Sequence, residues 1–166
     1  MRRTLVLAGV IAAGVVLEST LLAHLRLGGT RPDLLVLAVI AVAMACGPVT
    51  GATFGFAAGL VSDLEFAGPV GVSALVYTVI GFGMGAARIY VTSSRTWVHL
   101  LIAAAASLAS VWLSGVVLRV FDLSSWAFLA RSGPWITVYN LLLTPLVYPL
   151  VRTLAERAGQ GPTDRW

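Results

Sequence analysis

Long apolar runs follow one another along almost the whole chain, with only short polar segments between them. The hydrocarbon core of a bilayer is about 30 Å thick, so a helix needs roughly 20 residues to cross it, and fewer where the bilayer thins. The candidate spans are Thr4–Ala23, Asp33–Cys46, Pro48–Ser62, Pro69–Arg88, Trp97–Val120 and Pro134–Leu154. This pattern predicts an all-α integral membrane protein with six transmembrane helices in a single bundle.

The composition of the chain is also that of a membrane protein. Of its 166 residues, 58% are hydrophobic and 11% are charged, whereas a soluble domain has about 25% charged residues. The formal net charge of +4 comes from scattered arginines without any lysine, so there is no basic stripe that would follow nucleic-acid phosphates. We therefore expect membrane lipid around the helices and no nucleic-acid partner.

The arginines indicate how the helices are oriented. With six spans and the N-terminus inside, the cytoplasmic side carries Arg2, Arg3, Arg88, Arg95, Arg152, Arg157 and Arg165, and the outside carries Arg26, Arg31, Arg119 and Arg131. This excess agrees with the positive-inside rule and predicts that both termini are cytoplasmic. An alternative stays open, in which spans two and three form one helix kinked at Pro48. That alternative gives five spans and places most arginines outside, unless the N-terminal end itself lies outside.

The two ends of the chain suggest where the bundle begins and ends. The N-terminus has the charge-then-apolar form of a signal peptide, but its apolar stretch, Thr4–Ala23, is longer than a typical signal core. We expect it to be retained as the first helix. The segment after Leu154 is polar and glycine-rich. The expected division is a six-helix transmembrane domain over residues 1–154 and a flexible cytoplasmic tail over residues 155–166.

Two neighbouring spans carry residues spaced four apart along one helical face: Gly51, Gly55, Gly59 and Asp63 in the third span, and Gly81 and Gly85 in the fourth. We call these five glycines the glycine stripe. Small residues at this spacing let helices approach closely in lipid. The stripe predicts tight packing of the third span on the fourth, and it leaves open a partner helix or ligand in the groove.

Three carboxylates near predicted helix ends are candidate functional groups. Asp63 and Glu65 are two positions apart, so a helix would point them in different directions. We expect a pair of loop carboxylates that face the outside rather than an acid–base pair. Glu18 lies in the outer part of the first span, where an ionisable group is costly and is a functional hypothesis by default. The alternative is that Glu18 extends to the outer interface beside Ser19 and Thr20.

The chain offers no recognisable catalytic arrangement. An intramembrane aspartyl protease using Asp33 and Asp63 lacks the motifs that this chemistry requires. The run GFGMGAAR at Gly81–Arg88 imitates a dinucleotide fingerprint, but no strand precedes it. His24 and His99 are predicted on opposite sides of the membrane, so they cannot share a metal ion. We expect no enzyme activity, no metal and no cofactor.

The longest segment between spans, RVFDLSSWAFLARSGPW, is rich in aromatic residues. Trp126, Phe128, Leu129 and Trp135 lie between charged residues, a pattern that suits a short helix in the outer interface. Tryptophans in that position commonly act as membrane anchors. The alternative is a docking surface for a membrane partner.

Several of these stretches are similar to a known family. The segments ESTLL at the end of the first span, RPDLLVL at the start of the second, GPVTGATFGFAAGLVSDL and GPVGVSALVYTVIG resemble the rod-shape-determining protein MreD family. The resemblance covers roughly residues 14 to 88, and the last two spans match in hydropathy and length. The family often has an amide where this chain has Glu18.

The resemblance implies a non-enzymatic subunit of the bacterial cell-elongation machinery in the cytoplasmic membrane. Its expected partners are an MreC-like bitopic protein, a peptidoglycan glycosyltransferase and transpeptidase, and MreB filaments. It also implies that Pro32 and Asp33 shape the start of the second helix, and that the glycine stripe and Asp63 build the third.

MreD-like proteins resemble in fold the substrate-binding subunits of energy-coupling-factor vitamin transporters. A vitamin-binding subunit is therefore the alternative function. Its site would need polar groups that converge in the outer half of the bundle, and the chain offers Glu18, Asp63, Glu65 and Trp126 for it.

Overall fold

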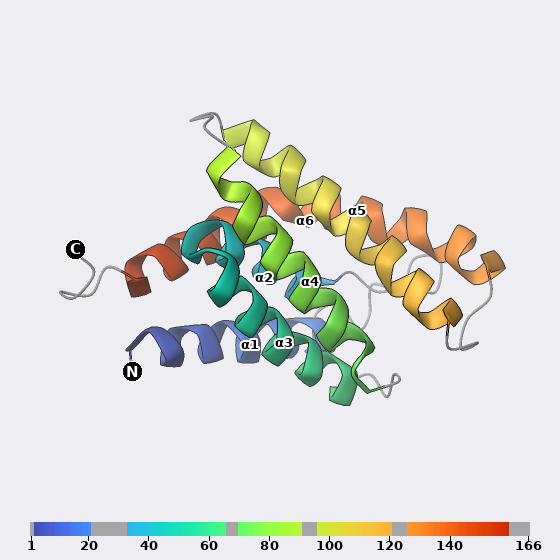
Figure 1. Ribbon diagram of the computed structural model, residues 1–166, viewed down its shortest axis with the longest axis horizontal. Coiled ribbons are helices and arrows are strands. Elements are labelled where there is room, and N and C mark those ends of the chain that lie inside the picture. The colour runs from blue at the N-terminus through green and yellow to red at the C-terminus, as the bar shows by residue number, and fades with distance from the viewer. Residues whose placement is uncertain (1, 21–32, 66–69, 91–95, 121–125, 160–166) are drawn as a thin grey trace.

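The computed structural model describes residues 2–20, 33–65, 70–90, 96–120 and 126–159. Within these ranges the chain forms six α-helices and one short 3-10 helix, and no strand. The elements are α1 (Arg2–Thr20), α2 (Leu34–Cys46), α3 (Pro48–Glu65), α4 (Val72–Ala87), η2 (Arg88–Tyr90), α5 (Thr96–Val120) and α6 (Trp126–Gly159). The helices pack into one bundle (Figure 1). The all-α class predicted from the apolar runs is confirmed.

The lengths of the apolar helices are those of a membrane protein. Three segments are long and apolar enough to cross a bilayer: Val72–Tyr90, Leu101–Val120 and Pro134–Ala155. Two shorter apolar segments, Thr4–Thr20 and Leu34–Cys46, accompany them.

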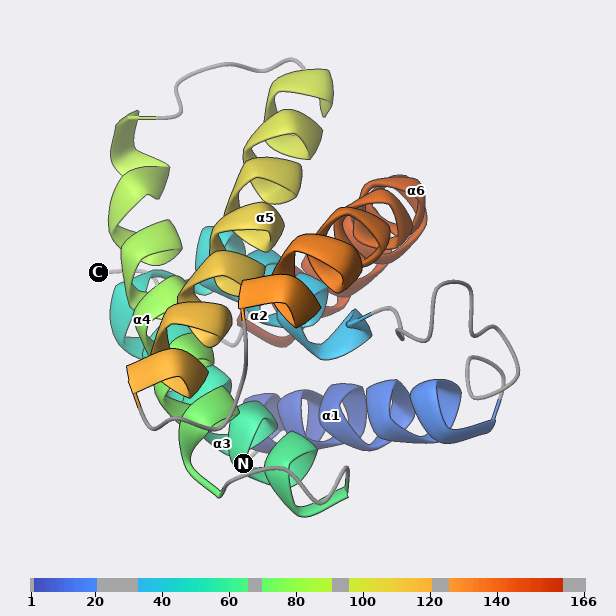
Figure 2. The ribbon, with the colours of Figure 1, turned by 90° about the vertical axis from the view of Figure 1, so that its right-hand side faces the viewer.

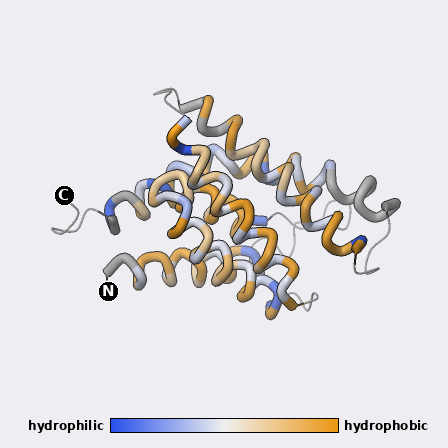
Figure 3. The backbone as a smooth tube through the Cα atoms, in the orientation of Figure 1, coloured by the Kyte–Doolittle hydropathy of each residue, from blue (hydrophilic) through white to orange (hydrophobic). Residues whose placement is uncertain are grey.

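The outer surface of the bundle is apolar as well. On α4 the side chains of Leu75, Val79 and Phe82 are about half exposed and face away from the bundle. Figure 3 shows hydrophobic residues along all of the described helices, with strongly hydrophilic positions mainly near helix ends. A surface of this kind is suited to lipid.

α2 and α3 are separate helices that meet at Gly47. This residue has a φ of 93°, which glycine adopts readily because it has no Cβ. Its N–H donates to the carbonyl oxygen of Ala43 at 2.8 Å, which closes α2. α3 then folds back on α2, and Gly51 lies against Ala43. The alternative of one long helix kinked at Pro48 is therefore wrong, because the chain reverses its direction at this point.

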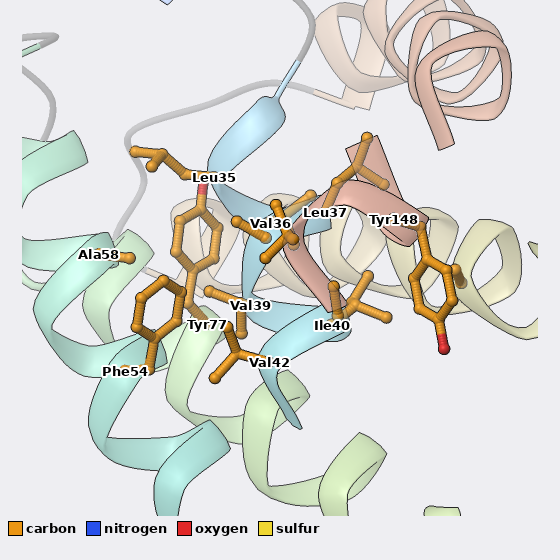
Figure 4. Close-up of a cluster of buried hydrophobic side chains, with 14 of the residues drawn as sticks. Leu35, Val36, Leu37, Val39, Ile40, Val42, Phe54, Ala58, Tyr77 and Tyr148 are labelled. Carbon is orange, nitrogen blue, oxygen red and sulfur yellow. The ribbon is translucent and has the colours of Figure 1, made fainter. Parts of the chain in front are cut away.

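α2 is the central element of the bundle (Figure 2). It contacts each of the other five α-helices, and all residues from Leu34 to Ala43 are buried. Its sequence, LLVLAVIAVAMAC, is apolar all round, which is typical of a helix surrounded on every side. Figure 4 shows Phe54 and Tyr77 packed on one side of α2 and Tyr148 on the other.

Two helices, α4 and α6, begin three or more residues away from the starts of the predicted spans. α4 begins at Val72 because Gly71, with a φ of 103°, forms the turn before it, and Pro69 lies outside the described residues. α6 begins at Trp126 and runs through Pro134, where the sixth span was expected to start. Membrane helices tolerate an internal proline because neighbouring groups satisfy the carbonyl that it frees. As a result, α5 and α6 extend beyond the ends of the other helices (Figure 1).

The expected boundary between the bundle and the tail is not tested by the fold. α6 continues to Gly159, and Ala155 is buried. Residues 160–166 lie outside the described part of the chain. The flexible tail over residues 155–166 stays a prediction.

Candidate functional site

The N-terminal end of α2 gathers polar side chains from several other helices. α2 has 13 residues and is about 20 Å long. The first backbone N–H groups of any helix have no partner within that helix, and here they are buried in the bundle. Five polar side chains surround them, and we call these residues the α2 cap cluster: Glu18, Asp33, Tyr77, Ser107 and Asn140.

Glu18 reaches the start of α2 from the last turns of α1. Its Oε1 accepts hydrogen bonds from the N–H groups of Leu34 and Leu35, the second at 3.1 Å. A carboxylate is stabilised at a helix N-terminus by the positive end of the helix dipole. The side chain is only 4% exposed, so the expected alternative in which it extends to the outer interface is wrong. Glu18 turns inward because the unpaired donors of α2 lie within its reach.

Asp33 is the N-cap of α2 and connects it to three further helices. Its Oδ1 accepts the N–H of Val36 at 2.9 Å, and its Oδ2 accepts the hydroxyl of Tyr77 on α4 at 2.6 Å. The N–H of Asp33 donates to Oδ1 of Asn140 on α6 at 3.0 Å. Asn140 in turn donates from Nδ2 to Oγ of Ser107 on α5 at 2.5 Å. The cluster thus joins α1, α2, α4, α5 and α6 at one point.

Asp63 accepts hydrogen bonds from the first backbone N–H groups of α4, as Glu18 and Asp33 do for α2. Its Oδ2 accepts the N–H groups of Gly71 at 2.7 Å and Ala74 at 3.4 Å, and its Oδ1 accepts that of Ser73 at 3.1 Å. Asp63 is 4% exposed. The expectation that this residue lies in a loop is therefore wrong, because α3 continues through it to Glu65. At Glu65, Oε2 is shielded from solvent and has no hydrogen-bond partner among the described residues.

The glycine stripe lies between α3 and α4 and brings their backbones together. A Cβ on Gly55 would lie 2.7 Å from the carbonyl carbon of Tyr77, and one on Gly59 would lie 2.5 Å from Cα of Ala74. These neighbours are backbone atoms, which cannot rotate away. Any residue larger than glycine would therefore have to push the two helices apart.

The other three glycines of the stripe continue this contact toward the opposite end of the helices. Gly51 and Gly81 each face the carbonyl oxygen of the other, and a Cβ on Gly85 would lie 2.5 Å from Cα of Pro48. α3 and α4 are consequently antiparallel along the whole stripe. The groove that the spacing suggested is filled by the neighbouring helix.

Arg88 occupies the opposite end of α2 from the cap cluster. Its Nη1 donates to the carbonyl oxygen of Ala45 at 3.3 Å, and its guanidinium lies beside Gly47. A cation is favoured at a helix C-terminus. α2 thus has carboxylates from α1 and from its own N-cap at its start, and an arginine from η2 at its end.

The arrangement of these groups supports the placing of helices rather than bond-breaking chemistry. Asp33 and Asp63 cap different helices, and each uses its oxygens for backbone N–H groups or for Tyr77. Across the described residues, no three His, Cys, Asp or Glu side chains are grouped so that they could hold a metal ion. His24 lies outside those residues, and His99 lies on α5.

The four residues considered for outer docking all belong to α6. Trp126, Phe128 and Leu129 lie in its first two turns, and Trp135 is 47% exposed further along. They therefore lie on a helix that is continuous with the span, and not on a separate interfacial helix. Their role in docking stays a prediction.

Sequence reasoning did not find Tyr77 and Ser107, and it did not pair Asn140 with Asp33. A signal was present, since each is a polar residue inside an apolar run such as SALVYTVIG or AAAASLAS. Their partners could not be read from spacing. Tyr77 is 44 positions from Asp33, and Asn140 is 107 positions from it.

Comparison with known proteins places the chain in a family. No curated protein and no solved structure matches it significantly. The family model described as rod shape-determining protein MreD matches residues 1–158, which include nearly all of the described helices. The match extends the resemblance seen in residues 14 to 88 across α5 and α6, and the family implies a role in determining rod shape. The chain therefore belongs to the MreD family of rod shape-determining proteins.

Proposed function

We propose that this protein is a non-enzymatic scaffold subunit of the bacterial cell-elongation complex. In this role it holds an MreC-like bitopic protein beside a peptidoglycan glycosyltransferase and transpeptidase, and so controls cell shape. The family match over residues 1–158 is the observation that carries the proposal. The site supports it as well, since the buried carboxylates of Glu18, Asp33 and Asp63 are used to hold helix ends.

The proposed topology has six crossings of the bacterial cytoplasmic membrane, with both termini inside. α2 and α6 run in the same direction, because Asp33 is bonded to Asn140 at one end and the sulfur of Cys46 lies 4.0 Å from the carbonyl oxygen of Ala155 at the other. A parallel pair is expected if both helices run from the outside to the inside. The distribution of arginines supports the same orientation.

The proposed partner surface is the outer end of α6, with Trp126, Phe128, Leu129 and Trp135. α5 and α6 extend past the other described helices at this end (Figure 1). Aromatic side chains are enriched at the centres of protein interfaces. MreB filaments would contact the opposite, cytoplasmic side.

The vitamin-transporter alternative has less support from the site. A vitamin would need polar groups that converge on a cavity. Glu18 and Asp63 are instead bonded to backbone N–H groups, and the glycine stripe is filled by helix packing.

Affinity purification from native membranes, with mass spectrometry of proteins and small molecules, tests the proposed function. Recovery of an MreC-like protein and cell-wall synthases is expected, and recovery of transporter ATPase subunits with a bound vitamin would refute the scaffold role. Trp135→Ala is expected to reduce recovery of the partner severalfold. Phe82→Ala is the matched control, because Phe82 on α4 is 54% exposed and follows Gly81, which lies against Gly51 toward the opposite end of α2. Equal recovery with both variants would refute the proposed surface and leave the scaffold role standing.

A further inference from the structure

α1 is attached to the bundle differently from the other five α-helices. Where the structure describes burial in α1, Glu18 is the only buried residue. The apolar residues Leu7, Val10, Ile11 and Val15 are only partly buried against the core. α2 to α6 each bury several residues. The best-buried side chain of α1 is therefore a carboxylate.

This difference affects how firmly α1 is held, because lipid surrounds the helices. Lipid tails are as apolar as leucine, so membrane helices associate through close packing and hydrogen bonds rather than through the hydrophobic effect. The interhelical hydrogen bonds of α1 that the structure describes are the two that Glu18 accepts from Leu34 and Leu35. α1 also approaches α2 closely at Gly14, where a Cβ would lie 2.8 Å from Cδ2 of Leu35. Both contacts are with the first turn of α2, whereas the other contacts of α1, with α2, α3 and α6, are made by residues that are only partly buried.

The rest of the bundle does not depend on these contacts. Without Glu18, the start of α2 still has its own N-cap, Asp33, which remains bonded to Tyr77 and Asn140. α3 and α4 remain joined through the glycine stripe. On the far side of α1, a Cβ on Gly9 would meet no atom within 4 Å. α1 can therefore leave its place without breaking a contact between the other helices.

We propose that Glu18 is a latch that holds α1 against α2, and that α1 is a hinged cover of the central helix. When the two hydrogen bonds break, α1 moves away from α2 to α6, which stay together. The N-terminal half of α2, which includes Leu35, is then exposed to the surrounding lipid.

Thiol crosslinking of the full-length protein in lipid vesicles tests the latch. Gly14→Cys with Leu35→Cys, in a Cys46→Ala background, reports contact between α1 and α2. The native Cys46 with Ala155→Cys reports contact between α2 and α6, since the sulfur and the Ala155 carbonyl oxygen are 4.0 Å apart. Each pair is combined with Glu18→Leu, Glu18→Gln or Ser19→Ala. Ser19 is the matched control because it is exposed and bonds only to carbonyls of α1 itself.

Glu18→Leu is expected to slow the α1–α2 crosslink about tenfold, the order expected from loss of two buried hydrogen bonds. The α2–α6 crosslink is expected to stay unchanged. Glu18→Gln keeps an oxygen acceptor and is expected to retain most of the crosslinking, and Ser19→Ala all of it. An unchanged α1–α2 crosslink in Glu18→Leu would overturn the latch. Loss of both crosslinks would also overturn it, because Glu18 would then hold the whole bundle and not α1 alone.

Discussion

Replacement of Gly55 by alanine adds one methyl group where the backbones of α3 and α4 approach closely. That Cβ would lie 2.7 Å from the carbonyl carbon of Tyr77 and 3.2 Å from the backbone nitrogen of Thr78. Ordinary contact begins at 3.4 Å, so α4 must shift by at least the difference of 0.7 Å. Both neighbours are backbone atoms, so no rotamer change can relieve the overlap. The two helices have to separate, which weakens the contacts of the rest of the stripe.

The size of the effect follows from two opposing terms. Overpacking a well-packed interior costs about 1–3 kcal/mol, and alanine in place of glycine regains up to about 1 kcal/mol of helix propensity. We expect Gly55→Ala to lower the free energy of unfolding by about 1–2 kcal/mol, which corresponds to roughly 2–8 °C in melting temperature for a chain of this length. Gly55→Leu is expected to prevent the two helices from packing and to lower the folded yield.

Thermal unfolding of the purified protein in detergent, followed by circular dichroism, measures this difference. Gly83→Ala on α4 is the matched control, because a Cβ on Gly83 would meet no atom within 4 Å. It is expected to be neutral or slightly stabilising. If Gly55→Ala melts at or above the temperature of Gly83→Ala, then α3 and α4 do not pack through the glycine stripe as described.

Substitutions at four further positions test the contacts between helices. Gly51→Ala and Gly81→Ala are each expected to lower the free energy of unfolding. The double variant is expected to lose less than the sum of the two single losses, because the first shift of the helices makes room for the second methyl group. Additive losses in chemical unfolding would contradict a shared contact. Asp63→Ala is expected to cost about 1–2 kcal/mol through loss of the α4 cap, while Asp63→Asn, which keeps one acceptor, costs less. A melting temperature of Asp63→Ala equal to that of the unsubstituted protein would show that the cap contributes nothing. Tyr77→Phe keeps the shape of the ring but leaves a carboxylate oxygen of Asp33 without its donor. It is expected to lower the free energy of unfolding by about 1–3 kcal/mol. An unchanged unfolding midpoint would exclude a stabilising role for that hydrogen bond.

The membrane class and the number of helices follow from local features of the sequence. Apolar runs and their lengths indicate helices in lipid wherever they occur, because hydropathy depends on the residues of one segment alone. The glycines of the stripe were found for the same reason, since a spacing of four places residues on one face of any helix. Helix starts were less well predicted where a glycine turn or an internal proline decides them, as at Gly71 and Pro134.

The roles of the polar residues were decided by the tertiary structure. Sequence analysis singled out Glu18 because a carboxylate in a membrane span is costly, but it could not choose between an inward and an outward position. The choice depends on the unpaired N–H groups of Leu34 and Leu35, which belong to another helix. Asp63 was placed in a loop for a similar reason, because its partners lie across a turn that the pattern of apolar residues does not describe.

What the sequence by itself determined is therefore the set of helices, their suitability for lipid, the close approach of α3 and α4, and the resemblance to a family of cell-shape proteins. What only the tertiary structure decided is that α2 is the centre and that carboxylates from α1 and from its own N-cap hold its start. The physical reason is the range of the forces involved. Burial and helix formation are encoded within about twenty neighbouring residues, whereas a buried hydrogen bond requires two groups that the fold brings together, such as Asp33 and Asn140.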